Sequence, residues 1–180
     1  LQLSAWQKAG VVVYAVSLIL MFLVSTLYHA VSHPKAKTVL KRLDHCAIYL
    51  LIAGSFTPLL TIPIETPSAK AVLIVIWSMA LVGVGFKAFF AGRFKWISTA
   101  TYLLMGWLSV VVIYPLYQAL ATPGFLLLVV GGVAYTVGVI FYVNQKIPFN
   151  HAIWHCFVVM GAVSHCWLVV KYVLNGSLIS

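Results

Sequence analysis

The sequence predicts an all-α membrane protein, a single domain over residues 1–180 built as a bundle of six transmembrane helices. The chain is 63% hydrophobic and only 7% charged, whereas a soluble domain of this size needs far more charge on its surface. It also contains six stretches that approach the roughly 20 apolar residues of a helix crossing a bilayer core. These stretches are too continuously apolar to be barrel strands, in which apolar and polar residues alternate.

The six predicted helices are bounded by helix-breaking residues. Hydrocarbon leaves no water for unpaired backbone groups, so helices are the expected form of each span. In chain order the predicted helices cover residues 11–31, 44–62, 71–90, 97–119, 124–143 and 150–174. The connections carry His33–Pro34, Pro63 to Pro67, Gly92, Pro123–Gly124 and Pro148. Two prolines within predicted helices, Pro58 and Pro115, are expected to kink them.

The positive charges predict how the bundle is oriented. Eight Lys and Arg residues flank the connections after the first, third and fifth helices: Lys35, Lys37, Lys41, Arg42, Lys87, Arg93, Lys95 and Lys146. The other side has three: Lys8, Lys70 and Lys171. Loops rich in Lys and Arg stay in the cytoplasm. The net charge of +9 is therefore read as a topology signal rather than as a nucleic-acid surface.

Four ionisable residues are predicted to lie at the cytoplasmic level of three different helices. His29 comes near the end of the first helix, Asp44 at the start of the second, and His151 and His155 in the first turns of the last. Ionisable groups at membrane depth are costly and usually functional. The plain alternative is an interfacial position, with each polar tip among the headgroups. That alternative is accepted for His33 and His45, whereas His165 is expected to be buried and structural.

The spacing of the histidines favours a metal site. His151 and His155 are four residues apart, so they share a helical face and can bind one ion. His29 would complete the pattern of three protein ligands and one water that catalytic zinc adopts. Zinc is favoured over iron or copper because no Cys or Met is placed to help. Ala152 replaces the Glu of the metalloprotease helix, so a general base must come from another helix.

Asp44 and Ser25 are the candidate catalytic residues. A carboxylate near a metal can accept a proton from water and later return it, or it can orient a ligand histidine. Ser25 shares a helical face with His29, four residues away, and could orient water or hold a substrate oxygen. The alternative for Ser25 is a hydrogen bond to its own helix backbone.

Three segments of the chain together resemble the hemolysin III family. They are Ser25-Thr-Leu-Tyr-His29, the stretch from Asp44-His-Cys-Ala-Ile-Tyr to Phe-Thr-Pro58, and His151-Ala-Ile-Trp-His155. The family includes bacterial inner-membrane proteins grouped with the progestin and adipoQ receptors. The resemblance implies a seven-helix bundle, with one helix before the first span of this sequence. It also implies zinc held near the cytoplasmic face by residues matching His29, His151 and His155, with Asp44 and Ser25 close by.

The resemblance extends to a superfamily that looks like the alkaline ceramidases. We therefore expect a zinc-dependent hydrolase of lipid amide or ester bonds in a bacterial inner membrane, with a membrane lipid as substrate or ligand. One alternative is a receptor-like or homeostasis sensor whose zinc is structural. A second is a hemolysin-type pore-former that causes cytolysis, although the spans lack the polar stripe that a conductive path needs. A third is a haem-binding electron carrier.

Overall fold

The computed structural model describes residues 2–90 and 93–175, and its secondary-structure elements over these residues are all helices. In chain order the elements are α1 (Ala5–Ala30), α2 (Pro34–Thr61), α3 (Pro67–Phe90), α4 (Lys95–Trp107), the 3₁₀ helix η1 (Leu108–Val112), α5 (Ile113–Ala119), α6 (Thr122–Val143), α7 (Asn150–Trp167) and the π-helix η2 (Leu168–Leu174). Six helical stretches of the described chain are long and apolar enough to cross a membrane. The predicted all-α membrane fold is therefore confirmed.

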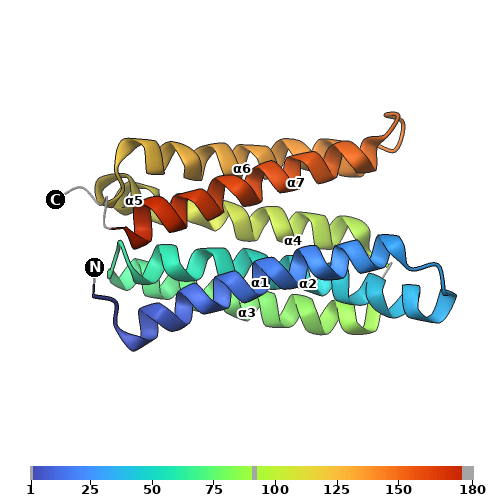
Figure 1. Cartoon of the computed structure of the whole chain (residues 1–180), viewed down its shortest axis with the longest axis horizontal. Helices are drawn as coiled ribbons and strands as arrows, with labels where there is room; N and C mark the ends of the chain where they lie inside the picture. Colours follow the sequence, from blue (N-terminus) through green and yellow to red (C-terminus); the bar gives the residue numbers. More distant parts are fainter. Residues whose placement is uncertain (1, 91–92, 176–180) are drawn as a thin grey trace. The chain divides into compact units, whose positions relative to one another are not determined.

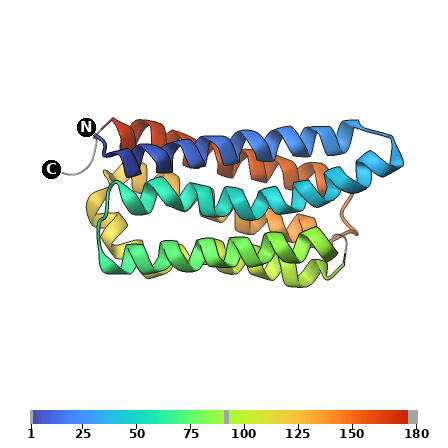
Figure 2. The ribbon, with the colours of Figure 1, turned by 90° about the horizontal axis from the view of Figure 1, so that it is seen from below.

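Contacts between Cα atoms divide the described chain into an N-terminal unit, residues 2–112, and a C-terminal unit, residues 113–175. In the N-terminal unit α1 and α3 both pack along α2, as Figures 1 and 2 show, and α4 also contacts α2. Accordingly α2 is the most buried helix, with 61% of its most apolar window enclosed. Tyr49 lies at the centre of this unit, 2% exposed, with its ring against Gly83 of α3 and 4.5 Å from the ring of Tyr102.

Helix α2 begins at Pro34, ten residues before the predicted start at Asp44. The side chain of His33 accepts a hydrogen bond from the backbone N–H of Ala36, and Pro34 occupies the first helical turn. Proline is pre-organised for that position because its missing N–H would be unpaired there in any case. The charged segment from Lys35 to Arg42 is thus helical, and Asp44 lies about three turns inside the helix.

The fourth predicted span changes its helical form near Pro115. The α-helix gives way to η1 at Leu108, and α-helix resumes in α5 at Ile113. Proline has no N–H to donate, and its ring clashes with the carbonyl of the residue four positions earlier, here Val111. A stretch of 3₁₀ helix accommodates this in the turn before the proline. Pro58, in contrast, lies within continuous α-helix in α2.

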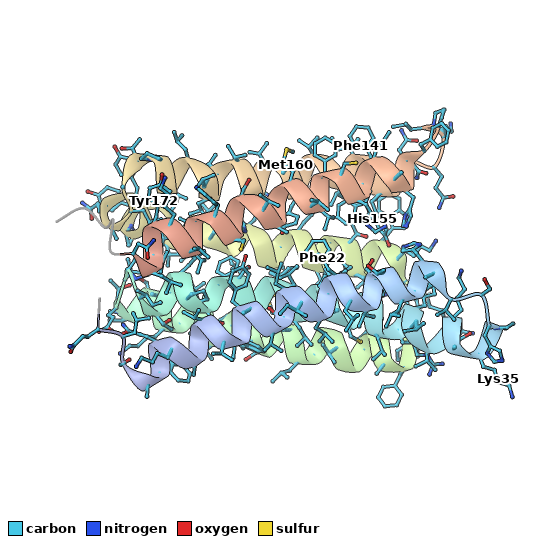
Figure 3. All side chains as sticks on the ribbon, in the orientation of Figure 1. Phe22, Lys35, Phe141, His155, Met160 and Tyr172 are labelled. Atoms are coloured by element: carbon cyan, nitrogen blue, oxygen red, sulfur yellow. The ribbon has the colours of Figure 1, made fainter. Side chains whose placement is uncertain are left out.

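In the C-terminal unit, α6 and α7 run side by side in opposite directions (Figure 1), and they are joined by a short turn. Phe141 and His155 lie toward the end of this pair that carries the turn, and Tyr172 lies toward the opposite end (Figure 3). The amide of Asn150 donates to the carbonyl oxygen of Phe141 at 3.2 Å, which joins the first residue of α7 to the last turn of α6.

Candidate metal centre

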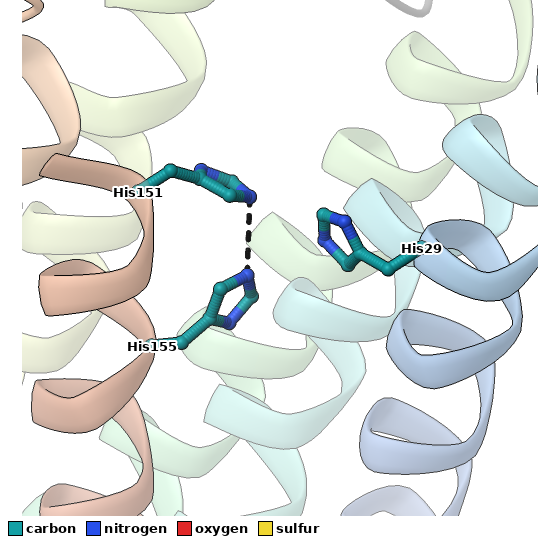
Figure 4. A group of neighbouring side chains, drawn as sticks. All are labelled: His29, His151 and His155. Carbon is teal, nitrogen blue, oxygen red and sulfur yellow. Dashed lines mark hydrogen bonds between the residues drawn. The ribbon is translucent and has the colours of Figure 1, made fainter. Parts of the chain in front are cut away.

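His151 and His155 form a close pair on the first two turns of α7. Their Nε2 atoms lie 3.1 Å apart, and the two rings meet nearly at right angles, with centroids separated by 4.6 Å (Figure 4). The i, i+4 spacing places both side chains on one face of the helix. The predicted pairing of these two histidines is therefore present in the structure.

The start of α7 places this pair directly after the α6–α7 turn. Phe149 precedes the helix in the left-handed conformation, with φ of 56°, so the chain turns sharply into Asn150. A phenylalanine in this conformation is unusual. Because the helix begins so abruptly, His151 is already on its second residue and the pair lies at the helix end rather than in mid-span.

The geometry of the pair fits a shared metal ion. Two nitrogens bound to one tetrahedral zinc at about 2.0–2.1 Å lie roughly 3.3 Å apart, and the observed Nε2–Nε2 separation is 3.1 Å. Neutral imidazole is also among the donors that zinc prefers. A hydrogen bond between opposite tautomers gives a similar separation, so the geometry is compatible with a metal without requiring one.

His29 belongs to the N-terminal unit. It lies exposed in the last turn of α1, and its ring centroid is 4.8 Å from that of Tyr28. Like His151 and His155, it offers one imidazole nitrogen as a possible metal ligand. The assignment of His29 as the third ligand stays a prediction.

Asp44 lies inside α2 rather than at its start, and its side chain is only 13% exposed. Oδ2 lies 3.6 Å from Nδ1 of His45, while buried Oδ1 has no hydrogen-bond partner among the described residues. A buried carboxylate oxygen left unpaired costs free energy, about 1–3 kcal/mol or more. Such an atom commonly marks a catalytic group or a place for water or an ion.

The neighbour of Asp44, His45, is part of this arrangement, and its side chain is only 14% exposed. Its Nδ1 donates to the carbonyl oxygen of Lys41 at 2.7 Å, which turns the ring back along α2 toward Asp44. The backbone carbonyl of His45 accepts from the hydroxyl of Tyr102 at 3.0 Å, linking this turn of α2 to α4. The bond from His45 to the Lys41 carbonyl, four residues earlier in the same helix, could have been anticipated from the sequence. The contact with Tyr102 depends on the fold and could not.

Ser25 is buried in α1 and differs from most hydroxyl residues of the helices. Its neighbour Thr26 donates to the carbonyl oxygen of Phe22 at 2.7 Å, and Thr57 donates to that of Ala53 at 2.9 Å. Ser25 makes no such side-chain hydrogen bond with the residues that the structure describes, and it is 8% exposed. Its hydroxyl is therefore not committed to the helix backbone, which was the plain alternative for this residue.

Lys87 was counted with the positive charges that flank the connection after the third predicted helix, but the structure buries it. The side chain has no exposed area, and Nζ donates to the carbonyl oxygen of Arg93 at 3.2 Å. The burial of Lys87 could not be predicted from the sequence, because a lysine near a helix end usually extends its charged group into water.

The family model described as "Haemolysin-III related" matches residues 1–166 of the chain. The Hemolysin-3 homolog of Bacillus subtilis (strain 168) is 45% identical over 177 residues, which cover 98% of this chain and 83% of that protein. Hemolysin-3 of Bacillus cereus is 49% identical, with 90% of this chain and 74% of that protein covered.

A human protein, the monocyte to macrophage differentiation factor, is 33% identical over 96% of this chain and 74% of its own length. No solved structure gives a significant match. The family model covers most of the chain and both bacterial relatives are covered over more than two thirds of their length, in agreement with the six apolar helices. This membrane protein therefore belongs to the Haemolysin-III related family.

Proposed function

We propose that this protein is a zinc-dependent membrane hydrolase that acts on amide or ester bonds of a membrane lipid. In this proposal His29, His151 and His155 bind the zinc. The observation that carries it is the 3.1 Å separation of the His151 and His155 Nε2 atoms, which suits a shared ion. When bound, zinc polarises a substrate carbonyl and lowers the pKa of water.

Asp44 is the proposed proton carrier. Its unpartnered Oδ1 supports this role, because an acceptor without a protein partner is available to water or to substrate. The carboxylate takes a proton from the attacking water and returns it to the leaving amine or alcohol. The other oxygen, Oδ2, lies 3.6 Å from Nδ1 of His45, so the imidazole flanks the carboxylate on the side away from Oδ1.

Ser25 is the proposed binding group for a substrate oxygen or for water. Its hydroxyl is buried and makes no hydrogen bond to the described part of the helix backbone, so it can donate to a ligand. A hydroxyl donor in a water-poor site contributes more than the same group in water. The lipid substrate reaches the site from the surrounding membrane. We propose that this membrane is the bacterial inner membrane and that the Lys-rich loops lie in the cytoplasm.

The experiment compares zinc content and lipid turnover in purified protein. The variants are His29→Ala, His155→Ala and Asp44→Asn, with His33→Ala as the matched histidine control because the His33 side chain caps α2 and is not among the proposed ligands. We expect about one zinc in the wild type, in His33→Ala and in Asp44→Asn, and loss of zinc in the other two. Wild type should hydrolyse members of an amide and ester lipid panel, whereas Asp44→Asn should not.

Two results would replace this proposal. Stoichiometric zinc without turnover of any lipid, combined with loss of zinc in Asp44→Asn, would indicate a structural four-ligand site and favour the sensor. The bacterial relatives carry the name Hemolysin-3, which favours membrane lysis as a second candidate. Leakage of liposomes that is unchanged in His155→Ala would support lysis over hydrolysis.

A further inference from the structure

The contact between α6 and the span formed by α7 and η2 is built from glycines opposed by rings. On α6, Gly124, Gly131 and Gly138 recur every seven residues and so share one face. A Cβ at Gly131 would overlap the His165 ring, one at Gly138 would lie 2.8 Å from Cβ of Phe157, and one at Gly124 would lie 2.9 Å from the Tyr172 ring. The ring-bearing residues of α7 and η2 therefore occupy space that the α6 glycines leave free of side chains.

One contact of this kind runs in the opposite direction. Gly161 of α7 faces the ring of Tyr135 of α6, where an added Cβ would lie 2.7 Å from the ring. The rings of Tyr135 and His165 meet edge to face with centroids 5.6 Å apart, and His165 Nε2 donates to the carbonyl oxygen of Leu128 at 3.3 Å. We call the pairs Gly131–His165 and Gly161–Tyr135 the reciprocal glycine contacts.

We propose that the reciprocal glycine contacts set the rotation of α7 about its axis, and that His165 is thereby a positioning residue for the His151–His155 pair. At about 100° per residue, Gly161 and His165 lie within about 20° of Trp154 around the helix. His151 and His155 lie about 60° and 100° to one side of it. The α6-facing side and the ligand-bearing side are thus neighbouring but distinct faces of one rigid helix.

The rotation of α7 matters because a metal site requires its ligand atoms to be placed precisely. An imidazole nitrogen lies about 5–6 Å from the helix axis, so a 20° turn of α7 moves it by about 2 Å. A functional constellation tolerates displacements of about 0.5 Å. His165 is about 15 Å along the helix from His155. Its contact with Gly131 nevertheless limits the rotation of α7 that would misplace both His151 and His155.

The test uses Gly131→Ala, with the adjacent Gly132→Ala as matched control. A Cβ at Gly132 meets nothing within 4 Å, so both variants change the helix equally but only one displaces the His165 ring. Two quantities are measured: zinc affinity by chelator competition, and the distance between spin labels at Ile140→Cys and Val159→Cys in a background without native cysteines. Gly131→Ala should weaken zinc binding about 10- to 100-fold, as loss of outer-shell support does, and shift the interspin distance.

Two further variants decide the role of the ring. Gly131→Ala combined with His165→Ala should recover most of the zinc affinity, because the methyl group occupies space that the ring has left. His165→Ala alone should also weaken zinc binding and shift the labels, and it decides the matter if Gly131→Ala does not fold. A lower melting temperature with unchanged zinc affinity and unchanged interspin distance would overturn the proposal.

This inference rests on the proposed metal site only for the zinc measurement. If the wild type bound no zinc, the proposed function would fail, and the interspin distances of Gly131→Ala and Gly132→Ala would still decide whether the glycine contacts set the rotation of α7. Equal distances in those two variants would refute it.

Discussion

Helices α2 and α7 both carry candidate functional residues, but they are held in different ways. Three helices of the N-terminal unit contact α2, and 61% of its most apolar window is buried, against 28% for the span formed by α7 and η2. Within its own unit α7 packs along α6 through rings placed on glycines. Asp44 is therefore fixed by enclosure, whereas the direction of His151 and His155 depends on a few specific contacts.

This difference shows how membrane helices can be held without a hydrophobic driving force between them. Lipid is as apolar as a leucine side chain, so close packing and polar contacts decide helix association. Around α2 the polar contacts include the Tyr102 hydroxyl on the His45 carbonyl and the Trp77 Nε1 donor on the Thr57 hydroxyl. Between α6 and α7 the fit of rings against glycines predominates, with hydrogen bonds from Asn150 and His165.

The largest expected effect is on the enclosed carboxylate. Asp44→Asn should lower lipid turnover about 100- to 10,000-fold, because the amide cannot accept and return a proton. Zinc content should stay at the wild-type level. Glu65→Gln is the matched control, since Glu65 is the other acidic residue of the sequence and its carboxylate accepts from Gln7. Equal losses in the two variants would show that Asp44 has no special role.

The enclosure of α2 is tested next by Gly83→Ala. An added Cβ would overlap the ring of Tyr49, which is surrounded and has no room to move, so we expect a loss of about 1–3 kcal/mol in unfolding free energy. Gly85→Ala, two residues away, meets nothing within 4 Å and should be neutral or stabilising by up to about 1 kcal/mol. Detergent unfolding curves measure both, and equal midpoints would contradict the packing described for Tyr49.

The corresponding change between α6 and α7 is Gly138→Ala. It should cost about 1 kcal/mol, at the low end of the overpacking range, because the overlap is smaller than at Gly83. The partly exposed Trp154 ring can shift, and the Phe157 Cβ, 2.8 Å from the added Cβ, needs only a small movement of the α7 backbone. Gly132→Ala serves as the control in the same helix. A cost for Gly138→Ala equal to or greater than that of Gly83→Ala would remove the distinction between an enclosed and an adjustable helix contact.

The smallest expected effect concerns Ser25. Ser25→Ala should leave the unfolding free energy within about 0.5 kcal/mol of wild type, because the hydroxyl makes no hydrogen bond with the described residues. Turnover should fall about fivefold, the value of one hydrogen bond to a ligand. Thr26→Ala removes a hydroxyl that bonds the Phe22 carbonyl and should not change turnover. A stability loss in Ser25→Ala without a change in turnover would assign the residue to packing.

The sequence by itself determined the features that depend on local spacing. Continuous apolar stretches and prolines gave six membrane-length helices, and the four-residue interval placed His151 and His155 on one face. The prediction placed the start of α2 too late, at Asp44, because it was based on where the apolar residues begin and not on the residues that cap the helix. Pro34 and His33 begin the helix ahead of its apolar part, which carries Asp44 deeper into it.

Only the tertiary structure decided which of several locally equivalent residues matter. Gly131 and Gly132 are neighbours on one helix, yet one faces the His165 ring and the other faces open space. Lys87 looks in the sequence like any lysine near a helix end that reaches water, but the fold encloses it beside the Arg93 carbonyl. The reason is physical: composition and period fix that a helix forms and which residues share a face, while the role of each residue depends on what the neighbouring helix presents to it.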